Sequence, residues 1–127
     1  MDAIEVTVSC PNIKSGGVAF GVDMELLYSV LNNIRRRTQL PVIAKLTPDA
    51  PSIVESAKVA EEAGCDAVSA INTFRAFAID TKNKKLMIKG GLSGPAIKPI
   101  ALRMVWEISD EVHIPVIGIG GIMNGND

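Results

Sequence analysis

The chain has 127 residues, of which 47% are apolar and only 4% aromatic, and its formal net charge is -1. This length suits one ordinary domain, and a core of aliphatic side chains suits buried parallel strands covered by helices. The near-neutral charge without basic blocks argues against nucleic-acid binding. No apolar run approaches a membrane span, and the N-terminus lacks the layout of a signal peptide. We therefore expect a cytoplasmic protein with neither a nucleic-acid nor a membrane partner.

Strand and helix signals alternate from the N-terminus onward. The first predicted strand, 4–9, is stopped by Cys10-Pro11-Asn12. Asp23 is suited to cap a helix that runs from Met24 to about Arg37, because its side chain can accept from backbone N–H groups of the first turn. The apolar residues of this segment fall on one helical face.

The same alternation continues through the middle of the chain. A second strand is predicted at Val42–Leu46, and Pro51 is suited to the first position of the next helix. That helix is expected to end at Ala63-Gly64, where glycine can take a left-handed conformation. A third predicted strand, Ala67–Ile71, ends in Asn72-Thr73.

The pattern loosens at 74–88 and becomes rich in lysine, which indicates a hairpin beyond the strand end. The segment 90–95 is predicted as a loop that leads into a third helix, on which Trp106 is expected to pack. A fourth strand is predicted at 114–118, and another helix is expected to begin near Asn124. The apolar face of the third helix is predicted to contain Ile97, Ala101, Met104, Val105, Ile108 and Val112.

The order β-α-β-α-β-α-β requires parallel strands joined by right-handed crossovers. An open doubly wound sheet and a (β/α)8 TIM barrel share this order. Polar or glycine residues follow all four strands, and in a barrel these ends converge on one site, whereas an open sheet gathers its site at one switch point. We therefore predict a barrel. Because only four units are present, residues 1–127 are expected to form a partial barrel domain, without the N-terminal units and the last unit.

Five segments carry a family resemblance. Ser9-Cys10-Pro11-Asn12, followed by Lys14-Ser15-Gly16-Gly17, resembles the active-site loop of class 1 dihydroorotate dehydrogenases, particularly those of the 1B type. The similarity runs nearly end to end and the motifs keep their order, so together they are specific. The other four segments are Pro41–Leu46, Ile71–Thr73, Gly90–Pro99 and Ile117–Ile122.

The resemblance implies a TIM barrel that binds FMN and oxidises dihydroorotate to orotate in pyrimidine biosynthesis. Cys10 would be the general base that removes the proton from C5, while hydride passes from C6 to FMN. A free thiol has a pKa near 8.5, so the rate should rise with pH until the thiolate is formed. A free cysteine is more often a small buried hydrophobe, but the place of Cys10 on a strand-end loop favours the catalytic role.

The resemblance also implies the cofactor residues. Lys45 would contact the flavin, where its charge stabilises the reduced ring; the alternative is a lysine that extends to solvent at the strand end. Ile71 would line the flavin. Gly94 precedes a helix N-terminus, and Gly120-Gly121 would form the first half of the FMN phosphate site, although a glycine pair is also ordinary turn geometry.

Four residues are implied in substrate binding: Asn12, Asn72, Thr73 and Thr7. Amide side chains suit the cyclic urea and carboxylate of dihydroorotate because they both donate and accept, although Asn-Thr is also a common strand-ending pair. Thr7 stands where the family usually has asparagine. Threonine lacks the reach of the amide, so an altered specificity is one reading.

The resemblance further implies partners and leaves alternatives open. A separate subunit with FAD and an iron–sulfur cluster would pass electrons to NAD, and the enzyme is expected to be a homo-oligomer. The alternatives are a related FMN-dependent pyrimidine-reducing enzyme, a Schiff-base enzyme that uses Lys45, and an inactive barrel fragment. No metal site is expected, and Cys65 and His113 are assigned structural roles. Since two sheet edges would be unpaired, we expect the isolated chain to associate and to bind FMN weakly.

Overall fold

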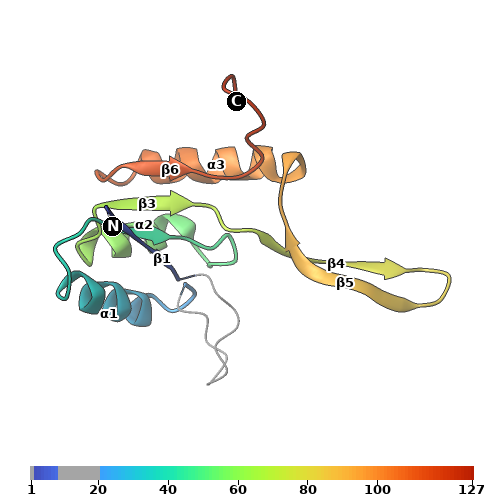
Figure 1. Ribbon diagram of the computed structural model, residues 1–127, viewed down its shortest axis with the longest axis horizontal. Coiled ribbons are helices and arrows are strands. Elements are labelled where there is room, and N and C mark those ends of the chain that lie inside the picture. The colour runs from blue at the N-terminus through green and yellow to red at the C-terminus, as the bar shows by residue number, and fades with distance from the viewer. Residues whose placement is uncertain (1, 9–20) are drawn as a thin grey trace.

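A computed structural model describes residues 2–8 and 21–127 of the chain. Its centre is a four-stranded parallel sheet with the strand order β1-β2-β3-β6 (Figure 1). The strands are β1 (Ile4–Thr7), β2 (Val42–Lys45), β3 (Ala67–Ala70) and β6 (Val116–Gly118). The connecting helices are α1 (Met24–Arg35), α2 (Ile53–Glu62) and α3 (Lys98–Ser109), the last preceded by the short 3-10 helix η1 (Pro95–Ile97). Within the part of the chain described, no helix is long and apolar enough to cross a membrane.

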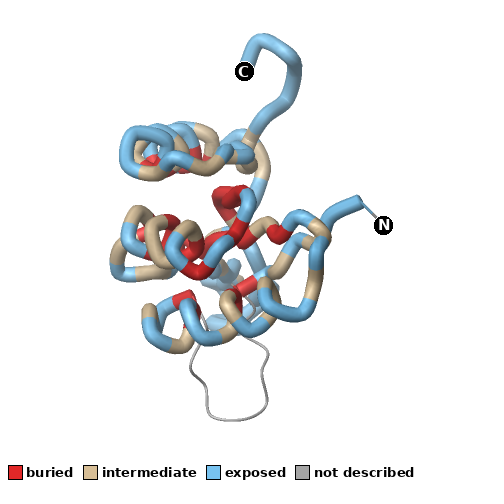
Figure 2. Tube along the Cα trace, turned by 90° about the vertical axis from the view of Figure 1, so that its left-hand side faces the viewer, coloured by how far each residue is buried: buried red, intermediate tan, exposed pale blue. Residues whose placement is uncertain are grey.

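The sheet is a sector of a barrel and not a doubly wound sheet. Its strands neighbour one another in chain order, with no reversal and hence no switch point. Alternate strand residues, among them Val6, Ala44 and Val68, pack into the core with the helices. The intervening residues point to the opposite face of the sheet, as barrel strands require. Buried residues gather in the interior between the strands and the helices (Figure 2), so the predicted partial barrel is confirmed.

The helix termini follow local capping rules, with one correction. The Asp23 Oδ1 atom accepts from the backbone N–H of Leu26 at 3.0 Å, which confirms the predicted cap of α1. The expectation that Pro51 starts α2 is wrong, because Ser52 caps this helix by accepting from the N–H of Glu55 at 3.2 Å. Gly64 has φ +88° after the last turn of α2, as predicted.

The third helix buries a narrower face than its sequence indicates. Ala101, Met104 and Ile108 are buried, as predicted. Trp106 is 73% exposed, so the expectation that it packs is wrong. Trp106 lies two positions after Met104 and two before Ile108, and at 3.6 residues per turn this places the indole on the opposite side of the helix.

The lysine-rich excursion is an antiparallel hairpin that extends away from the sheet (Figure 1). Its strands are β4 (Phe74–Asp80) and β5 (Lys85–Leu92), so the hairpin is confirmed, but Gly90 and Gly91 belong to β5 and not to the predicted loop. A side chain at Gly91 would collide with Thr73. The hairpin is tied back to the β2–α2 loop by an ion pair of 2.9 Å between Arg75 and Asp49.

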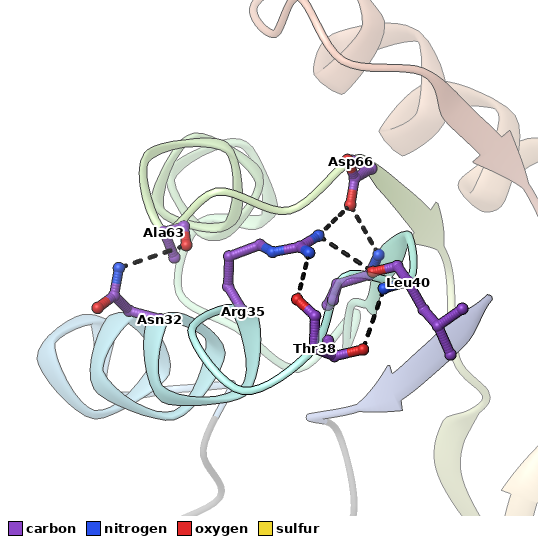
Figure 3. Close-up of polar contacts among 7 residues, drawn as sticks. Asn32, Arg35, Thr38, Leu40, Ala63 and Asp66 are labelled. Carbon is purple, nitrogen blue, oxygen red and sulfur yellow. Dashed lines mark hydrogen bonds and ion pairs between the residues drawn. The ribbon is translucent and has the colours of Figure 1, made fainter.

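A polar network joins the segments at the amino ends of the strands (Figure 3). The Arg35 guanidinium donates to Asp66 Oδ2 at 2.7 Å and to the carbonyl oxygens of Thr38 and Leu40 at 2.6 and 3.1 Å. The same Asp66 oxygen accepts from the N–H of Val42 at 2.8 Å. One guanidinium therefore fixes the end of α1, the start of β2 and the turn before β3.

The Arg35 network should contribute measurably to stability. We expect Arg35→Met to lower the free energy of unfolding by about 1–3 kcal/mol, since two partly buried carbonyl acceptors and a half-exposed carboxylate lose a charged donor. Urea unfolding followed by circular dichroism measures this change. Arg37→Met is the matched control, because Arg37 is exposed. Equal losses in the two variants would show that removal of charge, and not the network, is responsible.

Candidate active site

The carboxyl ends of β2, β3 and β6 adjoin one cleft with a volume of about 390 Å³. This volume lies in the range of small-molecule sites. Seven of the residues predicted from the sequence line the cleft: Lys45, Ile71, Asn72, Thr73, Gly94, Gly120 and Gly121. Ser93, Ile97 and Ile119 also line it; they were not assigned to the site from the sequence, although all three lie within segments that carry the family resemblance. Four separate segments of the chain thus meet at one place.

Lys45 brings a positive charge to this cleft. It is the last residue of β2 and is partly buried. In register it lies between Thr7 of β1 and Ser69 of β3. Within residues 2–8 and 21–127 its ammonium group has no ion-pair partner. A cation that faces an open cleft is a suitable site for an anionic group.

The connection from β3 to β4 forms the adjoining wall. The N–H of Asn72 donates to the carbonyl of Leu46 at 3.0 Å, which ties this connection to the end of β2. Asn72 is partly buried and Thr73 is exposed, and both line the cleft. Ile71, just before them, is 2% exposed and contributes an apolar surface.

Gly120 and Gly121, which follow β6, form a cradle of bare backbone that lines the same cleft as Lys45. They have φ values of +133° and +76°, which favour glycine over residues with a side chain. A Cβ atom at Gly121 would lie 2.6 Å from Lys98 Cβ and 2.8 Å from the carbonyl oxygen of Gly94. The chain can therefore pass this closely over the start of η1 and α3 only without side chains. Together with Gly94, this arrangement fits the close approach of a phosphate to backbone N–H groups.

An ion pair between Lys98 and Asp127 holds the loop that follows β6. The Asp127 carboxylate also accepts from the N–H groups of Met123 and Asn124 at 2.7 and 3.2 Å. No helix begins at Asn124 in the described chain, contrary to expectation, because this carboxylate satisfies the N–H groups of a turn there. The Lys98 ammonium lowers the pKa of Asp127 below its usual range.

Two predicted residues, Cys10 and Asn12, lie outside the described residues. The structure does place the strand that leads to them: β1 ends at Thr7, followed by the buried Val8. Thr7 is exposed and pairs with Lys45, so it stands beside the cleft without lining it.

Cys65 and His113 lie away from the cleft. Cys65 is 4% exposed between α2 and β3, as expected for a packing residue. His113 lies in the connection to β6 and is 3.6 Å from Glu61. In the described part of the chain, no three His, Cys, Asp or Glu side chains are grouped to hold a metal ion.

Burial raises the pKa of the Cys65 thiol from its ordinary value of 9.0 to about 11. The folded state therefore favours the neutral thiol, and this contribution to stability is present below pH 9 and lost as pH rises through about 11. We expect the free energy of unfolding to fall over this interval, and to fall less in Cys65→Ala. Urea titrations at stepwise pH measure the slope. Identical slopes for the two proteins would contradict this prediction.

The fold and the cleft define a sector of a (β/α)8 barrel protein with a ligand site at the carboxyl ends of its strands. Residues 1–127 match the family model for dihydroorotate dehydrogenase over their whole length. The chain belongs to the dihydroorotate dehydrogenase family.

Relatives and solved structures agree with this assignment. The catalytic subunit of dihydroorotate dehydrogenase B (NAD(+)) from Petrotoga mobilis is 52% identical over 130 residues, which are 100% of this chain and 43% of that protein. The corresponding subunit from Geobacter sulfurreducens is 52% identical over 128 residues, 98% of this chain and 42% of that protein. The Eimeria tenella enzyme in complex with ferulenol superposes with a TM-score of 0.77 over 98% of this chain and 40% of that chain, at 21% identity, which supports the fold alone. The chain thus spans less than half the length of these relatives.

Proposed function

We propose that this chain supplies the catalytic base and part of the flavin and substrate sites of a dihydroorotate dehydrogenase, which oxidises dihydroorotate to orotate in pyrimidine biosynthesis. The observation that carries the proposal is the convergence of seven predicted residues on one cleft. Its lining combines a cation, an amide, a hydroxyl and a bare-backbone cradle. In the sequence, Cys10 follows Thr7, the last residue of β1, by three positions, and Thr7 pairs with Lys45 in the sheet register.

The residues of the cleft fit FMN. The cradle of Gly94, Gly120 and Gly121 would hold the phosphate, and Lys45 with Ile71 would contact the ring, where a fixed positive charge favours the reduced form. A bound FMN would supply the acceptor for the hydride that leaves C6 of dihydroorotate. Cys10 would take the proton from C5.

The remaining cleft residues would orient the substrate. Asn72 and Asn12 would donate to and accept from the carboxylate and cyclic urea of dihydroorotate. Thr73 and Thr7 would add hydroxyl groups. The relatives are named as catalytic subunits of an NAD(+) enzyme, and we propose that this protein likewise passes electrons to NAD through a separate subunit with FAD and an iron–sulfur cluster. We further propose a cytoplasmic homo-oligomer.

The direct test uses a complete barrel. In a chimera, this chain replaces the matching 43% of the Petrotoga mobilis subunit. We expect the chimera to bind one FMN and the bound FMN to lose its yellow colour when dihydroorotate is added without oxygen. Dihydrouracil, which lacks the carboxylate, should not reduce it. A folded chimera that binds no flavin, or that responds to dihydrouracil and not to dihydroorotate, would contradict the proposal.

Thr7 offers a test of the substrate site. In the chimera, we expect Thr7→Asn to lower KM for dihydroorotate roughly fivefold, because the amide restores about one hydrogen bond to the substrate. Thr7→Val should raise KM, since the hydroxyl is lost. Steady-state kinetics measures both changes. Indistinguishable KM values in the three proteins would show that this side chain does not reach the substrate.

A further inference from the structure

The face of the sheet that bears Lys45 also carries a polar pair, Glu5 on β1 and Ser69 on β3. The Ser69 hydroxyl donates to Glu5 Oε1 at 2.8 Å. Both residues alternate with core residues, Glu5 with Val6 and Ser69 with Val68, and so point away from the helices. Ser69 has no exposed surface, whereas Glu5 is exposed. The bond therefore lies on the face that becomes the interior of a closed barrel.

The position of this bond relative to Lys45 follows from the strand register. Strand β2 lies between β1 and β3, with Glu5 opposite Ile43 and Ser69 opposite Lys45. The hydrogen bond must therefore cross β2 diagonally, between the side chains of Ile43 and Lys45. Along β2, this bridge lies on the amino-terminal side of the Lys45 side chain, and the cleft lies on its carboxyl-terminal side.

The side chain of a lysine at this position needs a neighbour that limits its conformations. Its side chain has four flexible carbons and carries about 2 kcal/mol of rotamer entropy, so an unrestrained ammonium would occupy many positions. A charge acts strongly on a nearby ring only when it is held in place, since misplacement by about 1 Å can cost on the order of 100-fold in rate. The Glu5–Ser69 bridge fills the space on the amino-terminal side of the stem and leaves the cleft open.

We infer that Glu5 and Ser69 are positioning residues that direct the Lys45 ammonium into the cleft. This inference rests on the proposed function, because it concerns the charge that Lys45 presents to a bound flavin. The property at issue is the binding of reduced FMN relative to oxidised FMN, which a positive charge near the ring increases.

The test is made in the complete chimera by redox and binding titrations with FMN. We expect Ser69→Ala, which breaks the bridge without changing the charge of this face, to lower the affinity for reduced FMN relative to oxidised FMN on the order of tenfold, the lower end of what outer-shell partners contribute at metal sites. Ser69→Thr keeps the hydroxyl donor and the charge of this face, so it should retain the native ratio. Ser69→Ala removes a single oxygen atom, so it breaks the bridge with the smallest change in packing.

A second background separates positioning from a general loss of packing. In Lys45→Met, adding Ser69→Ala should leave the ratio unchanged, because the charge that the bridge positions is gone. If Ser69→Ala keeps the native ratio, or lowers it equally in the Lys45→Met background, the inference is overturned. If the chimera without these substitutions binds no FMN, that result would instead contradict the proposed function.

Discussion

In the complete chimera, Cys10→Ala is expected to abolish most dihydroorotate oxidation while FMN remains bound. General-base catalysis contributes about 10²–10⁴-fold, so we expect kcat to fall by this factor. In the unaltered chimera, the rate should rise with pH and level off near the thiol pKa, roughly 8.5 when unperturbed. In Cys10→Ser, where the hydroxyl ionises far above this range, the rate should keep rising. Stopped-flow measurement of flavin reduction at several pH values reports all three.

The second cysteine provides the matched control for this experiment. Cys65 is buried, and its pKa of about 11 keeps it neutral at the pH of the assay. Cys65→Ala should therefore leave kcat and its pH profile unchanged. A Cys10→Ala chimera that still turns over dihydroorotate at the unaltered rate would exclude this cysteine as the base. Loss of bound FMN in the same variant would show that its effect is structural.

Gly121→Ala is expected to weaken FMN binding at least about tenfold. An alanine forced to φ near +76° carries left-handed strain of roughly 1–2 kcal/mol. Its Cβ would also lie 2.8 Å from the carbonyl oxygen of Gly94, where the backbone has little room to yield. The loop would have to move away from η1, which opens the cradle that we propose for the phosphate. Quenching of flavin fluorescence on binding measures the dissociation constant.

Gly125 is the control for this substitution. It lies four residues further along the same loop, and a Cβ atom there would meet nothing within 4 Å. Gly125→Ala should therefore bind FMN as the unaltered chimera does. If Gly121→Ala also retained full affinity for FMN, the phosphate would have to bind elsewhere. Binding of riboflavin, which lacks the phosphate, should change much less in Gly121→Ala than binding of FMN.

The opposite ends of the barrel sector have different tasks. Lys45 and the glycine cradle lie at the carboxyl ends of the strands, where the cleft is found. Arg35 and Asp66 form their network at the amino ends, next to Val42. This division follows the pattern of (β/α)8 barrels, in which one end carries the site and the other supports stability. Substitutions at Arg35 should therefore act on unfolding and not on FMN affinity.

The sequence alone determined the order of elements, the barrel class and most of the cleft. Each of these depends on local signals: aliphatic runs predict strands, Asp23 predicts a cap, and polar residues after each strand predict a shared edge. Seven predicted residues meet in one cleft because parallel strands bring their carboxyl ends together. The motifs that surround them also carried the family resemblance.

Only the tertiary structure decided which side chains contact each other across the fold. Glu5 and Ser69 are 64 residues apart, and Lys98 and Asp127 are 29 apart, so no local pattern pairs them. Trp106 is exposed because helix packing, and not hydrophobicity, chooses the buried face of α3. Such contacts depend on the register of neighbouring strands and on helix rotation, which the whole chain sets together.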